Sequence, residues 1–187
     1  FICRGGDAIT EIPKERWNVD SFFSPEPGRK GKMYARHGGF LEGYKEFDAG
    51  FFGFSPREAA TLDPQQRLLL EVTWEAFEDG NLVPANFAAS PVGVYIGLFM
   101  HDFENLHSRP TEHDYFTPYS ATGMSTSVAA NRISHVFDFR GPSMVVDTAC
   151  SSSLVAIHLA CESLLNKECE LAIAGGVNAL LQPEMYM

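Results

Sequence analysis

The chain has 187 residues, of which 45% are hydrophobic and 20% are charged, an ordinary composition for a globular protein with a sizeable core. Its 24 acidic residues outnumber its 14 basic residues and give a formal net charge of −10 at pH 7. This balance argues against a nucleic-acid partner, because phosphates attract basic surfaces. No apolar run approaches the roughly 18 residues of a membrane span, so we expect no membrane span.

The four cysteines show neither a Cys-x-x-Cys pair nor the dense spacing of a disulfide-rich domain. They therefore predict reduced thiols and a cytoplasmic protein. The first residues resemble neither a signal peptide nor a natural start, and we expect an internal fragment of a longer chain. The cysteines are Cys3, Cys150, Cys161 and Cys169.

The first half of the chain holds a basic loop and two helix starts. Residues 24–32 contain two prolines, two glycines and three basic residues, which indicates a solvated surface loop more than a docking site for an acidic partner. The sequence SPRE at 55–58 is typical of a capping box, with proline at the first helical position. Asp63 before Pro64 repeats this capping pattern at the start of a second helix, and Gly80 ends that helix. Capping explains Asp63 without a catalytic role.

The middle of the chain combines one clear strand with an irregular segment. Residues 92–97 are β-branched and bounded by glycine, which predicts a buried strand. Residues 100–119 are irregular and carry His101, His107 and His113. The spacing of these histidines fits neither an i, i+4 helical pair nor a compact zinc pattern, so we expect no metal site.

Residues 141–165 give the strongest local pattern. A short apolar run at 144–146 predicts a strand, and the turn that follows it reaches Cys150. After three serines, an apolar stripe at three- and four-residue spacing predicts an amphipathic helix that packs this stripe against a core. A helix at 125–137 and a buried strand at 171–174 complete an α/β protein with helix-covered sheets. The stripe comprises Leu154, Ile157, Cys161, Leu164 and Leu165.

Cys150 is the candidate catalytic residue, because it lies between a strand and the first turn of a helix. The thiolate is the reactive form of cysteine, and the N–H groups and dipole at a helix N-terminus favour an anion. The same N–H groups could hold the oxygen of a tetrahedral intermediate, as an oxyanion hole does. The alternative is a buried cysteine that acts as a small hydrophobe, and the geometry alone leaves both interpretations open.

Several short motifs occur in one order along nearly the whole chain. They are FDA at 47–49, FFG at 51–53, DPQQR at 63–67, NRIS at 131–134, GPS at 141–143, DTACSSSL at 147–154 and AGGVN at 174–178. Together they resemble the β-ketoacyl synthase (ketosynthase) domains of type I polyketide synthases, and the motif around Cys150 resembles the active-site signature of that family. An ordered set of motifs is more specific than one short pattern, so the resemblance favours the interpretation of Cys150 as a nucleophile.

The resemblance implies a thiolase-like α/β fold, here the N-terminal part of a layered α/β/α/β/α condensing enzyme. Residues 1–187 are then a partial ketosynthase domain that lacks the first strand and the C-terminal portion. Cys150 is implied to take an acyl chain from a carrier-protein thioester, with its own backbone N–H as part of the oxyanion hole. A malonyl-type extender then loses CO2, and its carbanion attacks the acyl-enzyme in a decarboxylative Claisen condensation.

The resemblance also implies partners. An acyl carrier protein brings acyl and malonyl-type thioesters on its phosphopantetheine, so this chain is expected to bind no cofactor directly. The helix at 125–137 and the strand before Cys150 are implied to form a homodimer interface. Met124 is implied to border the acyl pocket.

The histidines of this chain are not expected to serve the condensation step. The two histidines that the family uses lie in motifs beyond residue 187, so the 187 residues alone are expected not to condense. His158 stands roughly 12 Å from Cys150 along the helix axis, and His135 has no sequence reason to face the thiol.

Other functions stay open from the sequence. One is a ketosynthase-like domain that only binds acyl chains or scaffolds a dimer, and another is a fatty-acid synthase ketosynthase. A thiolase or a cysteine hydrolase of another fold is disfavoured, because neither matches the triple serine after Cys150 or the DPQQR run at 63–67.

Overall fold

The computed structural model describes residues 1–107 and 117–187. The predicted irregular segment at 100–119 is therefore described only in part, and His113 lies outside the described residues. The described residues form two compact units. One unit comprises Phe1–Tyr44 and Ala179–Met187, and the other comprises Lys45–Asn178. None of the helices in the described parts of the chain combines the length and the apolar character needed to cross a bilayer.

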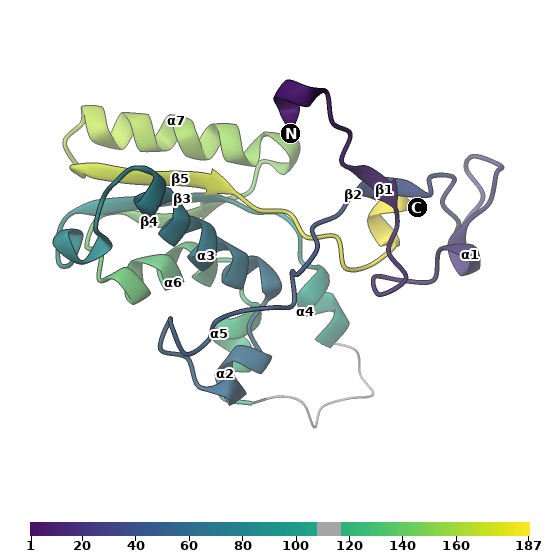
Figure 1. The fold of residues 1–187 in the computed structure, drawn as a ribbon, viewed down its shortest axis with the longest axis horizontal. Coiled ribbons are helices and arrows are strands. Elements are labelled where there is room, and N and C mark those ends of the chain that lie inside the picture. The colour runs from purple at the N-terminus through teal and green to yellow at the C-terminus, as the bar shows by residue number, and fades with distance from the viewer. Residues whose placement is uncertain (108–116) are drawn as a thin grey trace. The chain divides into compact units, whose positions relative to one another are not determined.

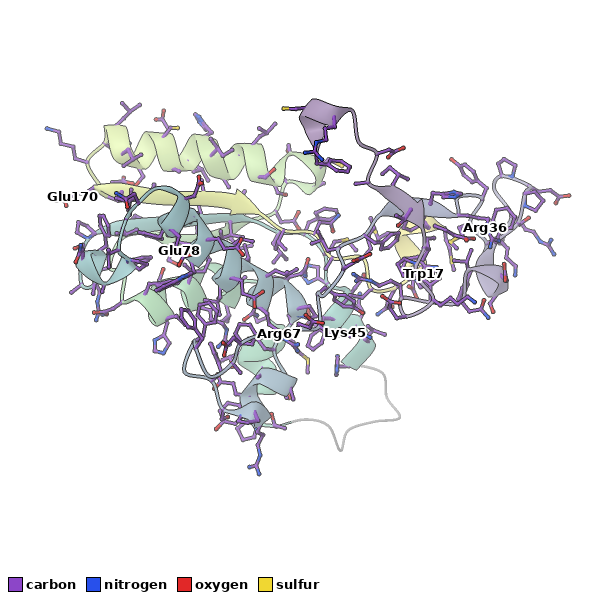
Figure 2. All side chains as sticks on the ribbon, in the orientation of Figure 1. Trp17, Arg36, Lys45, Arg67, Glu78 and Glu170 are labelled. Atoms are coloured by element: carbon purple, nitrogen blue, oxygen red, sulfur yellow. The ribbon has the colours of Figure 1, made fainter. Side chains whose placement is uncertain are left out.

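The smaller unit is built on a short antiparallel strand pair, β1 (Ile9–Glu11) and β2 (His37–Gly39), with the helix α1 (Val19–Phe22). Its core centres on Trp17, labelled in Figure 2, whose ring centroid lies 6.0 Å from that of Phe40 and 5.6 Å from that of Tyr186. Phe40 and Tyr186 come from opposite ends of the chain, so Trp17 joins both segments of this unit. Two short 3-10 helices complete it, Ile2–Arg4 and Glu184–Tyr186.

Part of the basic charge near the predicted surface loop is neutralised within the smaller unit. Arg36 donates to the carboxylates of Glu11 at 2.7 Å and Asp20 at 2.9 Å, and Lys32 Nζ donates to the Ser21 carbonyl at 2.8 Å. Arg29 and Lys30 of the loop are exposed, as expected for a loop that faces water, whereas Lys32 is half-buried.

A three-stranded parallel sheet organises the larger unit, in the order β4 (Ser143–Val146), β3 (Val92–Gly97), β5 (Leu171–Gly176). The helix α7 (Ser152–Leu165) covers one face of this sheet, and α3 (Pro64–Asp79) and α6 (Val128–Phe137) cover the other (Figure 1). Strands that alternate with covering helices confirm the predicted α/β class.

The central strand β3 is buried along its whole length, as predicted. Its side chains alternate between the two faces, because successive residues of a strand point in opposite directions. Val92, Val94 and Ile96 pack into the hydrophobic core formed with α3 and α6. Tyr95 points to the other face and packs against Ala156 of α7.

The prediction that the apolar stripe of α7 packs against the core was wrong. All five residues of the apolar stripe are exposed, and the exposed fractions of Leu154 and Leu165 reach 70% and 76%. The buried positions are small, so the helix backbone approaches the sheet closely, and Tyr95 of β3 packs against Ala156 and Ala160 with Val146, Leu159 and Ala172 around them. Periodicity locates a stripe but does not say which side of the helix the sheet covers. The buried residues of α7 are Ser152, Ala156, Ala160 and Ser163.

The N-cap residues of both predicted capping boxes are confirmed, but the Glu58 and Gln66 side chains bind Arg132 instead of completing the boxes. The Ser55 hydroxyl accepts from the Glu58 backbone N–H at the start of α2 (Pro56–Ala60). The Asp63 carboxylate accepts from the Gln65 backbone N–H at 2.7 Å, and Gly80 follows the last residue of α3.

Two other elements differ from expectation. The helix predicted at 125–137 begins three residues later, as α6, and β5 is half-buried instead of buried because it forms an edge of the described sheet. Between β3 and α6, the described residues form two short helices. They are α4 (Asp102–His107) and α5 (Ser120–Met124).

Candidate active site

Cys150 occupies a sharp turn between β4 and α7. It is the middle residue of a 3-10 turn, Ala149–Ser151, and its free thiol side chain is exposed. The preceding residue, Ala149, has a φ of 54°, in the left-handed region. A residue with a side chain in this region costs roughly 1–2 kcal/mol, and such strained positions cluster at functional sites. The backbone therefore turns abruptly to present the thiol.

Hydrogen bonds from short polar side chains hold this turn. The Ser152 hydroxyl accepts from the Thr148 backbone N–H at 2.9 Å and donates to the Ala149 carbonyl at 2.7 Å. The Ser151 hydroxyl lies 2.8 Å from the Thr148 carbonyl oxygen and 2.9 Å from the Thr148 hydroxyl. The Asp147 carboxylate accepts from the Ala149 backbone N–H at 3.0 Å. Two of the three serines after Cys150 therefore stabilise the turn, a role that the sequence did not reveal.

Two glycines at strand ends make room for the start of α7. A Cβ atom on Gly97, the last residue of β3, would lie 2.5 Å from the Ser153 backbone nitrogen. A Cβ atom on Gly176, the last residue of β5, would lie 2.7 Å from the Ser153 Cβ. The helix start that carries Cys150 thus rests directly on the backbone of two neighbouring strands. Glycine at these strand ends was the only sequence signal for this close contact between α7 and the two strands.

A cavity of about 600 Å³ opens beside the thiol. The ends of β3 and β5 form one part of its wall, and the first turns of α7 form another. Phe99 and Ile157 are the bulky apolar side chains in the lining. The cavity therefore offers Cys150 both a polar turn and an apolar surface. Its lining is Gly97, Phe99, Ala149, Cys150, Ser152, Ser153, Ile157, Gly175, Gly176, Val177 and Asn178.

The groups around the thiol suit acyl transfer. Within residues 1–107 and 117–187, no acceptor takes a hydrogen bond from the Cys150 backbone N–H, so this donor is available to a ligand. His135 and His158 are exposed, and neither lines the cavity. No group of histidines, cysteines or carboxylates in the described part of the chain could hold a metal ion.

The profile of the β-ketoacyl synthase N-terminal domain matches residues 1–187, the whole chain. The chain belongs to the β-ketoacyl synthase family. It is 46% identical over 187 residues to the erythronolide synthase EryA3 of Saccharopolyspora erythraea, and 48% identical over 183 residues to the polyketide synthase ThaG of Burkholderia thailandensis. The matches cover 100% and 98% of this chain but only 6% and 3% of these much longer relatives.

Solved ketosynthase structures match the β-ketoacyl synthase chain in three dimensions. An oxazolomycin ketosynthase domain of Streptomyces albus gives a TM-score of 0.87 at 39% identity, over 98% of this chain and 32% of that chain. The ketosynthase from module 6 of the bacillaene synthase of Bacillus subtilis gives 0.85 at 35% identity, over 98% and 29%. The predicted family and the thiolase-like fold class are therefore confirmed.

The DPQQR motif of this β-ketoacyl synthase chain anchors α5. The Gln66 side-chain amide lies 3.1 to 3.3 Å from the carbonyl oxygens of Thr122, Gly123 and Ser125. Arg132 of α6 donates from Nε to Gln66 Oε1 at 2.6 Å and from Nη2 to the Thr122 carbonyl at 3.1 Å. Two motifs far apart in the sequence, DPQQR and NRIS, thus meet in one buried polar network.

The network fixes the segment that ends at Met124. The exposed fraction of Met124 is only 7%, and the residue does not line the cavity beside Cys150. Its assignment to the acyl pocket stays a prediction. Arg132 also pairs with Glu58 at 3.3 Å, and burial lowers the pKa of Arg132 while Glu58 raises it. Such a charge is retained inside a protein only when it is paired and hydrogen-bonded.

Replacing Asp63 by asparagine is expected to change how stability depends on pH. Burial raises the pKa of Asp63, although hydrogen bonds from Gln65 oppose this shift. A raised pKa means that the folded state binds the proton more tightly than the unfolded state, so stability falls as pH rises from about 3.9 through the folded-state value. Asparagine keeps the helix cap but does not titrate.

Denaturant unfolding of the intact protein and of Asp63→Asn at several pH values measures this effect. The free energy of unfolding of the wild type should fall relative to that of Asp63→Asn as pH rises above about 4. A difference that is constant with pH, or that changes in the opposite direction, would contradict the role of Asp63 as a buried carboxyl.

Proposed function

We propose that this chain carries the acyl-accepting nucleophile of a polyketide-forming condensing enzyme, and that Cys150 is this nucleophile. The observation that carries the proposal is the strained turn. It presents an exposed free thiol at the start of α7, beside an apolar cavity and next to a backbone N–H without a partner among the described residues. The proposed polyketide product is supported by the similarity of this chain to the erythronolide synthase EryA3 and the polyketide synthase ThaG.

In the proposed reaction, the Cys150 thiolate attacks the carbonyl carbon of an acyl thioester. The carbonyl π electrons move to oxygen, and the Cys150 backbone N–H donates to the resulting oxyanion. The oxyanion collapses, the bond to the carrier thiolate breaks, and that thiolate leaves and takes up a proton. The products are the acyl-Cys150 thioester and the free carrier thiol, so one thioester replaces another.

The second half of the reaction would form the new carbon–carbon bond. A malonyl-type thioester loses CO2, its carbanion attacks the acyl-Cys150 carbonyl, and the Cys150 thiolate leaves. We propose acyl carrier proteins as partners, with the acyl chain on the phosphopantetheine of one carrier and the malonyl-type extender on that of a second. We also propose a cytoplasmic homodimer. The four free cysteines support the compartment, and β4 as an edge of the described sheet supports the dimer, because an edge strand has unpaired backbone groups.

Intact-mass measurement after exposure to the N-acetylcysteamine thioester of butyrate tests the first half reaction. The intact protein should gain one butyryl group, and peptide mapping should place it on Cys150. Cys161 is the internal control, since it is also exposed and lies on α7, the helix that follows the turn of Cys150. No adduct, or a similar adduct on every exposed thiol, would contradict the proposal.

A second step separates a condensing enzyme from a domain that only binds acyl chains. Addition of a malonyl-loaded carrier protein to the butyryl-enzyme should release the butyryl group as a β-ketoacyl product on the carrier. An acyl-enzyme that persists after this addition would favour the non-condensing alternative.

A further inference from the structure

We infer that Ser152 is a positioning residue for acyl transfer, and that its hydroxyl aims the Cys150 backbone N–H at the oxyanion. The inference rests on the proposed function of Cys150 and assigns a role to a residue two positions further along. Ser152 is the first residue of α7 and has an exposed fraction of only 4%. Its side chain is therefore held in place by its surroundings and does not face solvent.

The hydroxyl of Ser152 connects the two residues before the cysteine. It accepts from the Thr148 N–H at 2.9 Å and donates to the Ala149 carbonyl at 2.7 Å. These two bonds enclose the Thr148–Ala149 segment, in which Ala149 adopts its left-handed φ of 54°. The hydroxyl thus stabilises a backbone conformation that a residue with a side chain rarely adopts.

The planarity of the peptide bond carries this effect to Cys150. The Ala149 carbonyl and the Cys150 N–H belong to the same peptide group, which is planar and trans. Fixing the direction of the carbonyl oxygen therefore fixes the opposite direction of the N–H. The Ser152 backbone N–H also donates to the Ala149 carbonyl, so the side-chain hydroxyl reinforces a contact that the helix already makes.

Ser151 provides a matched comparison within the same turn. Its hydroxyl is directed at the carbonyl and hydroxyl oxygens of Thr148, and neither of these belongs to the peptide group of the Cys150 N–H. Its side chain is exposed, unlike that of Ser152. Loss of the Ser151 hydroxyl therefore removes a hydrogen bond from the turn without releasing the Ala149 carbonyl.

Two reagents separate the positioning role from a structural one. The butyryl N-acetylcysteamine thioester reacts through an oxyanion, whereas iodoacetamide alkylates a thiolate by direct displacement and forms no oxyanion. In the intact protein, Ser152→Ala should acylate Cys150 roughly 10-fold to 100-fold more slowly than the wild type, because losing one oxyanion donor costs up to about 10²–10³-fold. The rate of alkylation of Cys150 by iodoacetamide should change less than about 3-fold.

Two further variants complete the test. Ser151→Ala should acylate at close to the wild-type rate, and Ser152→Thr, which keeps a hydroxyl, should recover most of the rate lost in Ser152→Ala. Wild-type acylation in Ser152→Ala would overturn the inference. So would a parallel loss of acylation and alkylation, which is the result of a collapsed turn or an unfolded chain. If the wild type itself forms no adduct, the proposed function of Cys150 fails first, and the two failures are thereby distinguished.

Discussion

Replacing Cys150 by alanine is expected to abolish acyl transfer, lowering the rate by at least about 10³-fold to the uncatalysed background, as removal of a nucleophile does in other covalent catalysts. The physical reason is that alanine offers no atom that can form the acyl intermediate. The exposed position of Cys150 on the turn means that this substitution should leave the fold unchanged. Intact-mass kinetics with the butyryl thioester, alongside a thermal unfolding curve, measure both effects.

The matched control for this variant is Cys161→Ala. Cys161 is also free and exposed, but it lies on the outer face of α7 and does not line the cavity. Cys161→Ala should acylate at the wild-type rate. If the adduct persisted in Cys150→Ala and disappeared in Cys161→Ala, the nucleophile would be Cys161, and the role assigned to the turn would be wrong.

Replacing Gly97 by alanine is expected to destabilise the larger unit by about 3 kcal/mol, the upper part of the range for an added methyl group in a packed interior. The new Cβ would lie 2.5 to 2.7 Å from the Ser152 carbonyl carbon and from the Ser153 nitrogen and Cα. All three are backbone atoms, so no side-chain rotation relieves the contact. The start of α7 must move away from β3, and Cys150 moves with it.

Acylation should therefore fall together with stability in Gly97→Ala. A displacement of about 1 Å at a reacting group can cost about 10²-fold in rate. The melting temperature and the acylation rate of the intact protein measure the two effects. A melting temperature and a rate both equal to those of the wild type would contradict the close contact between Gly97 and the start of α7.

Gly175→Ala is the matched control for the strand-end glycine. Gly175 precedes Gly176 on β5 and lines the same cavity, yet a Cβ atom at Gly175 would meet no other atom within 4 Å. The substitution should be neutral or slightly stabilising, because alanine lowers the entropy of the unfolded chain. Loss of stability in this variant equal to that in Gly97→Ala would point to a general requirement for glycine, and not to the close contact with Ser153.

The elements that the sequence predicted well depend on neighbours along the chain. The caps at Ser55 and Asp63 were predicted correctly because a cap joins residues two or three positions apart. The buried strand at 92–97 followed from its β-branched composition. The family followed from ordered motifs, and it confirms the α/β fold class. These features are local, so a single stretch of sequence contains the information that determines them.

The remaining features depend on which segments meet in space, and only the tertiary structure decided them. The apolar stripe of α7 lies on its outer face, so the periodicity of the sequence predicted the wrong packing face. The small residues, such as Ala156 and Ala160, face the sheet instead, because the helix backbone packs closely on β3 and β5. The contact between Gly97 and Ser153 joins residues far apart in the sequence. By itself the sequence determined the fold class, the family and the candidate nucleophile. The tertiary structure decided how that nucleophile is held, since its supports are backbone contacts between segments that no local pattern connects.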